Sequence, residues 1–160
     1  MTVMPDVGVP APDFTAIDDR GEPFQLSQLR GQWVVLYFYP KDGTPGCTRE
    51  ACAFRDASDA FARRGAVIVG VSPDSVRSHQ RFKERYGLSF RLLSDPGGRI
   101  AQLYGVWRER QLYGRRSFGV SRTTFIIDPE GILRAQFSDV RVDGHADEVL
   151  RSLEQLQQGL

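Results

Sequence analysis

The chain is poor in cysteine and carries little net charge. Only Cys47 and Cys52 occur among the 160 residues, and the two histidines stand far from them in the sequence. Zinc sites are usually built from closely spaced cysteines and histidines, and no CxxC pair is present, so a structural zinc is not expected. The formal net charge of +1 gives no general attraction to nucleic acid or to an acidic membrane surface.

The sequence also lacks an apolar run long enough to cross a membrane. Its first residues carry prolines and aspartates instead of a basic start followed by an apolar stretch, which argues against a secretory signal peptide. We therefore expect a cytoplasmic protein. A permanent disulfide is disfavoured in a reducing cytoplasm, so the two cysteines are expected to act transiently or catalytically.

What the sequence does contain is the material for one folded domain. Hydrophobic residues make up 41% of the chain and charged residues 26%, which is typical of a soluble globular protein. A chain of this length can bury a sizeable core. Because it shows no repeat, low-complexity tract or linker, we expect a single domain over residues 1–160.

Hydrophobic periodicity predicts alternating strands and helices. Continuous apolar runs at 33–39 and 66–71 are typical of strands buried on both faces. Shorter strands are expected at 14–17, 24–26, 90–93, 123–127 and 132–137, and helices at 47–64, 75–86, 100–104 and 147–156. This order predicts an α/β protein with a thioredoxin-like fold, in which a central mixed β-sheet is flanked by helices on both faces. His79 is expected on a polar, exposed helix face, and His145 close to a helix start.

The segment after the strand at 33–39 carries the chemistry. It reads PKDGTPGC and places Cys47 in the first turn of the next helix. Unpaired backbone N–H groups and the helix dipole stabilise an anion there, so a nucleophilic thiolate is expected. Gly46 lets the backbone approach a substrate closely. The N–H groups of Gly46 and Cys47 and the hydroxyl of Thr44 are candidate donors to developing negative charge. Pro40 could cover the thiolate from water.

This segment resembles the PxxxTxxC motif of peroxiredoxins. The longer string YPKDGTPGCTREACAFRD is similar to the peroxiredoxin Q group, also called bacterioferritin comigratory proteins, and so are residues 104–107 and 122–128. The resemblance extends over nearly the whole chain. It implies a monomeric thiol peroxidase that reduces hydrogen peroxide and organic hydroperoxides without metal, haem or flavin.

The resemblance also implies how the two cysteines work together. Cys47 would be the peroxidatic cysteine, which becomes a sulfenic acid when it attacks the hydroperoxide. Cys52 would be the resolving cysteine, which forms an intramolecular disulfide with Cys47. Thioredoxin or a glutaredoxin-like dithiol would then reduce this disulfide by exchange.

Further roles follow from the same resemblance. Thr44 would orient the hydroperoxide, and Pro40 would shield the thiolate. Arg122 would stabilise the thiolate and polarise the peroxide, so that Gly46, Thr44 and Arg122 together would form the substrate-binding group. Glu50 would orient an arginine.

Plainer interpretations remain open at this point. Without the resemblance, Cys52 could be a core residue, Arg122 a solvated charge and Thr44 a turn residue. The basic stretch at 107–116 has aromatic neighbours and could suggest nucleic acid, but the nearly neutral chain favours a solvated loop or a partner-facing segment. A dithiol oxidoreductase would predict the missing CxxC pair, and a redox sensor would show only weak turnover.

Overall fold

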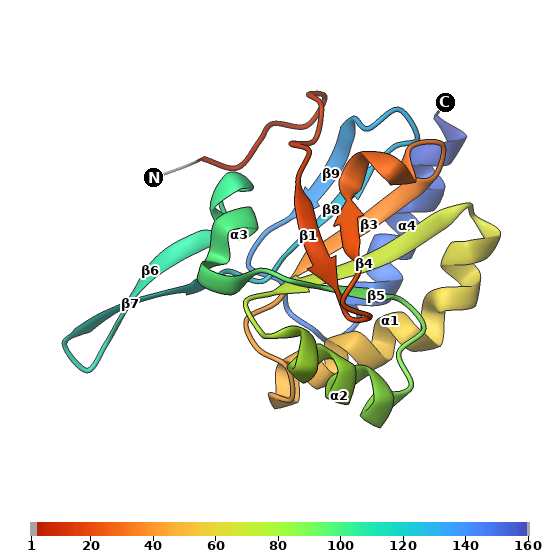
Figure 1. Ribbon diagram of the computed structural model, residues 1–160. Coiled ribbons are helices and arrows are strands. Elements are labelled where there is room, and N and C mark those ends of the chain that lie inside the picture. The colour runs from red at the N-terminus through yellow and green to blue at the C-terminus, as the bar shows by residue number, and fades with distance from the viewer. Residues whose placement is uncertain (1–2, 160) are drawn as a thin grey trace.

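The structure, a computed structural model, describes residues 3–159, within which the strands form a large sheet and a separate hairpin (Figure 1). The large sheet has seven strands. In spatial order they are β2 (Pro23–Gln25), β1 (Thr15–Asp18), β5 (Arg91–Ser94), β4 (Ala66–Ser72), β3 (Trp33–Phe38), β8 (Thr123–Ile127) and β9 (Leu133–Phe137).

The sheet is mixed, as the sequence predicts. The central strands β3, β4 and β5 run parallel to one another, whereas β8 pairs antiparallel with β3, and β1 and β9 extend the sheet in antiparallel fashion. All six residues of β3 are buried, which agrees with its continuous apolar sequence. A strand buried on both faces needs cover on both, and the helices supply it.

Helices cover both faces of the large sheet (Figure 1). One face carries the three longer helices, α1 (Pro45–Arg63), α2 (Val76–Tyr86) and α4 (His145–Gln158). The other carries α3 (Arg99–Leu103) and the 3-10 turn η1 (Leu26–Leu29), and a second 3-10 turn, η2 (Pro96–Gly98), leads into α3. The expected thioredoxin-like arrangement is therefore confirmed.

The alternation of side chains along β3 divides the core into two layers. Val35 and Tyr37 belong to the layer beneath α1 and α4, where Tyr37 stacks on Phe54 with ring centroids 4.7 Å apart. Leu36 and Phe38 point to the opposite layer, beneath α3 and η1. Aromatic burial on both sides fixes β3 rigidly, and its carboxyl end is therefore a stable platform for the loop that follows.

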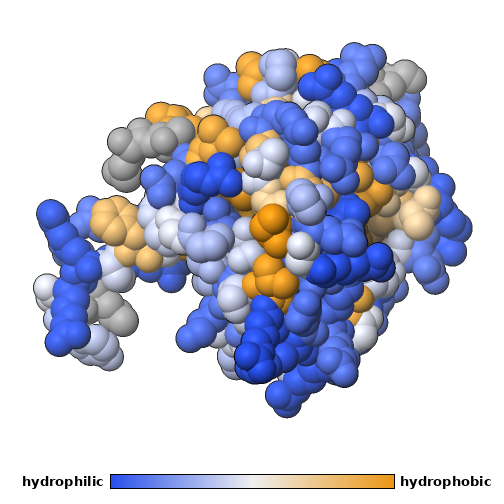
Figure 2. All heavy atoms as spheres, viewed as in Figure 1, coloured by the Kyte–Doolittle hydropathy of each residue, from blue (hydrophilic) through white to orange (hydrophobic). Residues whose placement is uncertain are grey.

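The basic stretch, which the sequence predicts to be a solvated loop or a partner-facing segment, forms a hairpin. Strands β6 (Trp107–Leu112) and β7 (Arg115–Val120) pair antiparallel and project from the body, and Figure 2 shows this arm as mostly hydrophilic. Its turn places Tyr113 at φ 55° and Gly114 at φ 74°. Two successive residues with positive φ suit a tight hairpin turn, so this turn closes strands whose polar composition had favoured a loop.

His79 is the clearest error among the sequence predictions, because its side chain is fully buried. Val76, His79 and Phe82 follow one another at helical spacing on α2, which places His79 on the inward face. Most element boundaries differ from the predicted ones by a residue or two: residue 26 belongs to η1 instead of a strand, and α1 and α4 each begin two residues earlier than expected, at Pro45 and His145.

The amino-terminal segment of the described part lies along the β9 edge of the large sheet. Pro10 forms an isolated bridge with Ile132, and the N–H of Gly8 donates to the carbonyl of Leu133 at 2.8 Å. Among the described helices, none is long and apolar enough to cross a membrane.

Candidate active site

The strand topology brings three distant segments to the carboxyl end of β3. Phe38, the last residue of β3, pairs with Thr123, the first residue of β8, so Arg122 lies next to the start of the following loop. On the other side, β4 runs parallel to β3, and the segment after β4 reaches the same loop through Asp74. Carboxyl ends of neighbouring parallel strands meet at one sheet edge, which is where α/β proteins usually place their sites.

Cys47 occupies the first turn of α1, as the sequence predicts. Thr44 precedes the helix in extended conformation, Pro45 is the first helical residue and Cys47 the third. The Thr44 hydroxyl makes no helix cap; it donates to the carbonyl of Lys41 at 3.0 Å. The helix therefore begins without a side-chain acceptor for its first N–H groups, which leaves their positive ends to an anion such as a thiolate or a ligand oxygen.

Arg122 joins Cys47 to a buried carboxylate. Its Nη2 lies 3.3 Å from the Cys47 sulfur, and its Nη1 donates to Oε1 of Glu50 at 2.6 Å. Cys47 and Glu50 are three residues apart on α1, so both face the guanidinium. A Cβ atom added at Gly46 would stand 3.3 Å from Arg122 Nη2, so a glycine here gives the guanidinium room. The sequence predicts that Gly46 lets a substrate approach the backbone closely. In the structure, the group beside Gly46 is the guanidinium of Arg122.

Burial sets the charges of this group. Glu50 is only 1% exposed, and burial raises the pKa of its carboxyl to about 7, although Arg122 acts in the opposite direction. Burial tends to lower the pKa of Arg122, but its ion pair with Glu50 and its contact with Cys47 outweigh this and raise it. The guanidinium therefore stays charged, and its Nη2 group points to the thiol while its Nη1 group points to Glu50.

Two further expected site residues, Cys52 and Pro40, make no side-chain hydrogen bond with Cys47, Glu50 or Arg122. Cys52 is half-buried on the same continuous helix, and both thiols are free. Pro40 is half-buried and directly follows β3 and Tyr39, at the start of the loop. Cys47 itself is 1% exposed. Only a small molecule can therefore approach its sulfur while α1 is intact.

Sequence reasoning missed a buried group centred on Asp42 and His79. Asp42 lies inside the PKDGTPGC segment, and His79 contacts its carboxylate at 2.7 Å from α2. The helical spacing of Val76, His79 and Phe82 was the available signal for the burial of His79. No comparable signal connected it to Asp42, because this contact depends on where α2 packs.

A thiol at a helix N-terminus, paired with an arginine on a thioredoxin-like sheet, defines a thiol-dependent oxidoreductase. The comparison with known proteins makes this specific. Residues 7–136 match the family model of the AhpC/TSA family, and the chain belongs to that family.

Similar sequences and similar solved structures are peroxiredoxins of the Bcp and Q type. The chain is 48% identical to a putative peroxiredoxin Bcp of Coxiella burnetii over 92% of this chain and 98% of the relative, and 44% identical to peroxiredoxin Bcp of Bacillus subtilis over 96% and 98%. Among solved structures, the bacterioferritin comigratory protein of Xanthomonas campestris superimposes with a TM-score of 0.88 at 38% identity, over 94% and 98% of the two chains. A peroxiredoxin Q of Xylella fastidiosa gives 0.91 at 33% identity, over 98% and 99%.

Proposed function

We propose that this chain is a single-domain thiol peroxidase that reduces hydrogen peroxide and organic hydroperoxides with Cys47. The observation that carries the proposal is the 3.3 Å contact between Arg122 Nη2 and the sulfur of Cys47 at the start of α1. A cationic donor beside a thiol at a helix N-terminus favours the nucleophilic thiolate. The Xanthomonas relative was studied for its alkyl peroxide reduction activity, which supports the same substrate class here.

The residues around Cys47 suit attack on an O–O bond. The Cys47 sulfur forms a bond to one peroxide oxygen while the O–O bond breaks, and the leaving oxygen takes up a proton to give water or an alcohol. Arg122 and the free N–H groups of the α1 start meet the negative charge of the leaving oxygen. Because the Thr44 hydroxyl already donates to Lys41, its oxygen is available to accept the hydroperoxide O–H. Pro40 shields the site from water.

The cycle closes through Cys52. Its thiol displaces water from the Cys47 sulfenic acid and forms the intramolecular disulfide, which an external dithiol of the thioredoxin or glutaredoxin type reduces by exchange. A dithiol oxidoreductase acting on protein disulfides fits less well, because a sulfur that is 1% exposed is reached by a peroxide and not by a folded protein. We further propose that the enzyme acts as a cytoplasmic monomer.

Peroxide consumption coupled to thioredoxin and its reductase tests this function. The protein should consume hydrogen peroxide and an alkyl hydroperoxide catalytically, with NADPH oxidised in proportion. Cys47→Ser serves as the control and should be inactive. A wild-type protein that reacts with neither peroxide, even in a single turnover, would refute the proposal, whereas one rapid turnover without recycling would point to a sensor or to another reductant.

A further inference from the structure

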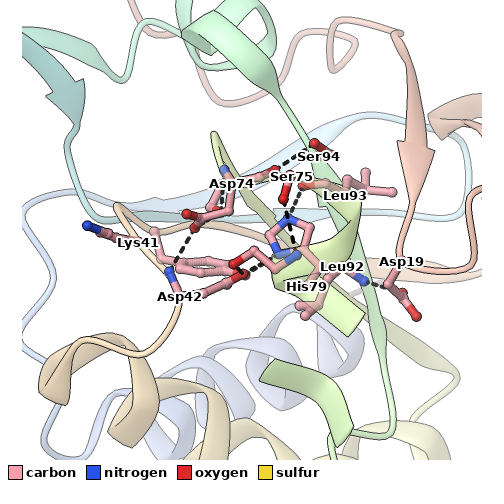
Figure 3. A network of polar contacts seen from close by, with 12 residues as sticks. Asp19, Lys41, Asp42, Asp74, Ser75, His79, Leu92, Leu93 and Ser94 are labelled. Atoms are coloured by element: carbon pink, nitrogen blue, oxygen red, sulfur yellow. Dashed lines mark hydrogen bonds and ion pairs between the residues drawn. The ribbon is translucent and has the colours of Figure 1, made fainter. Parts of the chain in front are cut away.

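A second polar cluster lies beside the active-site loop, and Figure 3 shows it between the loop, α2 and the end of β5. At its centre is the carboxylate of Asp42, whose side chain is 5% exposed. Its Oδ1 accepts from the Tyr39 hydroxyl at 2.6 Å, and its Oδ2 accepts from the Ser78 hydroxyl at 2.8 Å and lies 2.7 Å from His79 Nδ1. A buried carboxylate costs stability unless it is well hydrogen-bonded, and this one has three partners.

The imidazole of His79 uses both of its nitrogens. Nε2 lies 2.9 Å from the carbonyl oxygen of Leu93, which can only accept, so Nε2 carries a hydrogen. Nδ1 lies 2.7 Å from Oδ2 of Asp42. The ring therefore connects β5 to the loop in a fixed orientation, and Figure 3 shows it lying between these two partners.

The peptide group that joins Lys41 to Asp42 is held on both edges. Its N–H donates to Oδ2 of Asp74 at 2.7 Å, an oxygen that also accepts from Ser72 at 2.7 Å. Its carbonyl accepts from the hydroxyl of Thr44 at 3.0 Å. The orientation of this one peptide plane therefore sets the direction of the Thr44 hydroxyl, three residues before Cys47. The Asp42 side chain holds the same peptide plane through its contacts with Tyr39, Ser78 and His79.

We propose that His79 and Asp42 are positioning residues that hold the Lys41–Asp42 peptide so that Thr44 presents its oxygen to the hydroperoxide. This inference rests on the proposed peroxidase function and extends it to α2, which supplies no reacting group.

The same carboxylates and the histidine have ligand atoms within 4.8 Å of one another, a spacing that could also suit a cation. However, both oxygens of Asp42, both nitrogens of His79 and Oδ2 of Asp74 already take part in hydrogen bonds. Four of the donors are hydroxyl or backbone N–H groups, whose protons would face a bound cation. The arrangement therefore fits a positioning network better than a metal site.

The first test compares His79→Phe with Lys83→Met. His79→Phe keeps a ring in the core but removes both hydrogen bonds. Lys83 lies four residues further along α2 and pairs with Asp19 at 2.9 Å, away from the loop, so Lys83→Met controls for general damage to the helix. The measurement is the second-order rate constant for oxidation of Cys47 by hydrogen peroxide, followed by quenching, alkylation and mass spectrometry.

We expect a rate about ten to a hundred times lower in His79→Phe, because a small misplacement of a positioned group costs rate on this scale, and an unchanged rate in Lys83→Met. A structural role alone would lower the thermal midpoint of both variants and leave the rate constants equal to that of the wild type. A wild-type protein that does not react with peroxide would refute the proposed function itself. A reactive wild type with an equally reactive His79→Phe would overturn only the positioning role.

A double-mutant cycle tests whether His79 acts through Thr44. If it does, His79→Phe combined with Thr44→Val should react no more slowly than Thr44→Val alone. Additive losses in the double variant would overturn the proposed route. Should His79→Phe fail to fold, Ser78→Ala removes one donor to Asp42 without emptying the core, and it should lower the rate severalfold. An unchanged rate in Ser78→Ala would then overturn the proposal.

Discussion

A disulfide between Cys47 and Cys52 cannot form while α1 is intact. On a regular helix, residues five apart are separated by about 7.5 Å along the axis and about 140° around it, which puts their Cα atoms about 9 Å apart. An unstrained disulfide needs Cα atoms closer than about 7 Å. Because α1 runs without a break from Pro45 to Arg63, the proposed disulfide requires the first turns of the helix to unwind each time it forms.

The structure also indicates how far this unwinding goes. Each helical N–H donates to the carbonyl four residues earlier, so unwinding through Cys52 releases the amides up to Asp56. Phe54 opposes any further opening, because its side chain is fully buried and stacks on Tyr37. Exposing such a ring costs about 2–3 kcal/mol. We therefore expect the opening to include Cys47 to Cys52, while the Phe54 ring stays packed against β3.

Hydrogen exchange measured by mass spectrometry can test this prediction. Amides from Thr48, the first on α1 with a backbone acceptor, to about Asp56 should exchange about a hundredfold faster in the disulfide form, which corresponds to a loss of about 3 kcal/mol of local stability. The β3 and β4 amides should change little. Peroxide-treated Cys52→Ser is the matched control, since it oxidises at Cys47 without forming the disulfide and should keep its protection. Equal protection of this segment in the reduced and disulfide forms would refute the reasoning.

Three further outcomes are expected. Cys47→Ser should lose peroxidase activity, whereas Cys52→Ser should consume about one peroxide per chain and stall with thioredoxin, leaving sulfenic or sulfinic acid that mass spectrometry detects; normal turnover in Cys52→Ser would remove Cys52 from the mechanism. Arg122→Ala should slow the reaction of Cys47 with peroxide by roughly tenfold or more, and Arg122→Lys should restore the rate only in part; a wild-type rate in Arg122→Ala would contradict this role. For Glu50, burial raises the pKa in the folded state from 4.5 to about 7. The stability that the protonated carboxyl contributes is therefore complete below its unfolded-state pKa of 4.5 and is lost as the pH rises through about 7. Urea unfolding of Glu50→Gln should therefore show a flatter dependence on pH between these values than the wild type, and parallel curves would argue against the raised pKa.

Local features of the sequence were sufficient to predict the strand, loop and helix that carry Cys47. The apolar run at 33–39, the turn residues after it and the helical spacing of residues 51, 54 and 61 are all short-range signals. A buried strand, a tight loop and a helix in succession place Cys47 at the start of the helix, and none of these three signals depends on residues elsewhere in the chain. The position of Cys47 in the first turn of α1 could therefore be predicted from the residues next to it in the sequence.

Long-range contacts were not accessible in this way. Arg122 reaches Cys47 across 75 residues because β8 pairs antiparallel with β3, and only the resemblance to a family directed attention to this arginine. His79 stands in a predominantly polar helix, and its burial is compensated by Asp42 from another segment. A buried polar residue looks like a surface residue in the sequence when its hydrogen-bond partner is distant.

The placement of the site residues separates those that must move from those that must stay. Cys47, Glu50 and Cys52 all lie on the part of α1 that the proposed disulfide would unwind, whereas Arg122 directly precedes β8. Unwinding takes both the sulfur and the carboxylate away from Arg122, and a largely buried guanidinium that loses both partners is costly. This cost opposes the disulfide form and favours rewinding of α1 once the disulfide is reduced. The contact between Glu50 and Arg122 therefore stabilises the state in which Cys47 can react again.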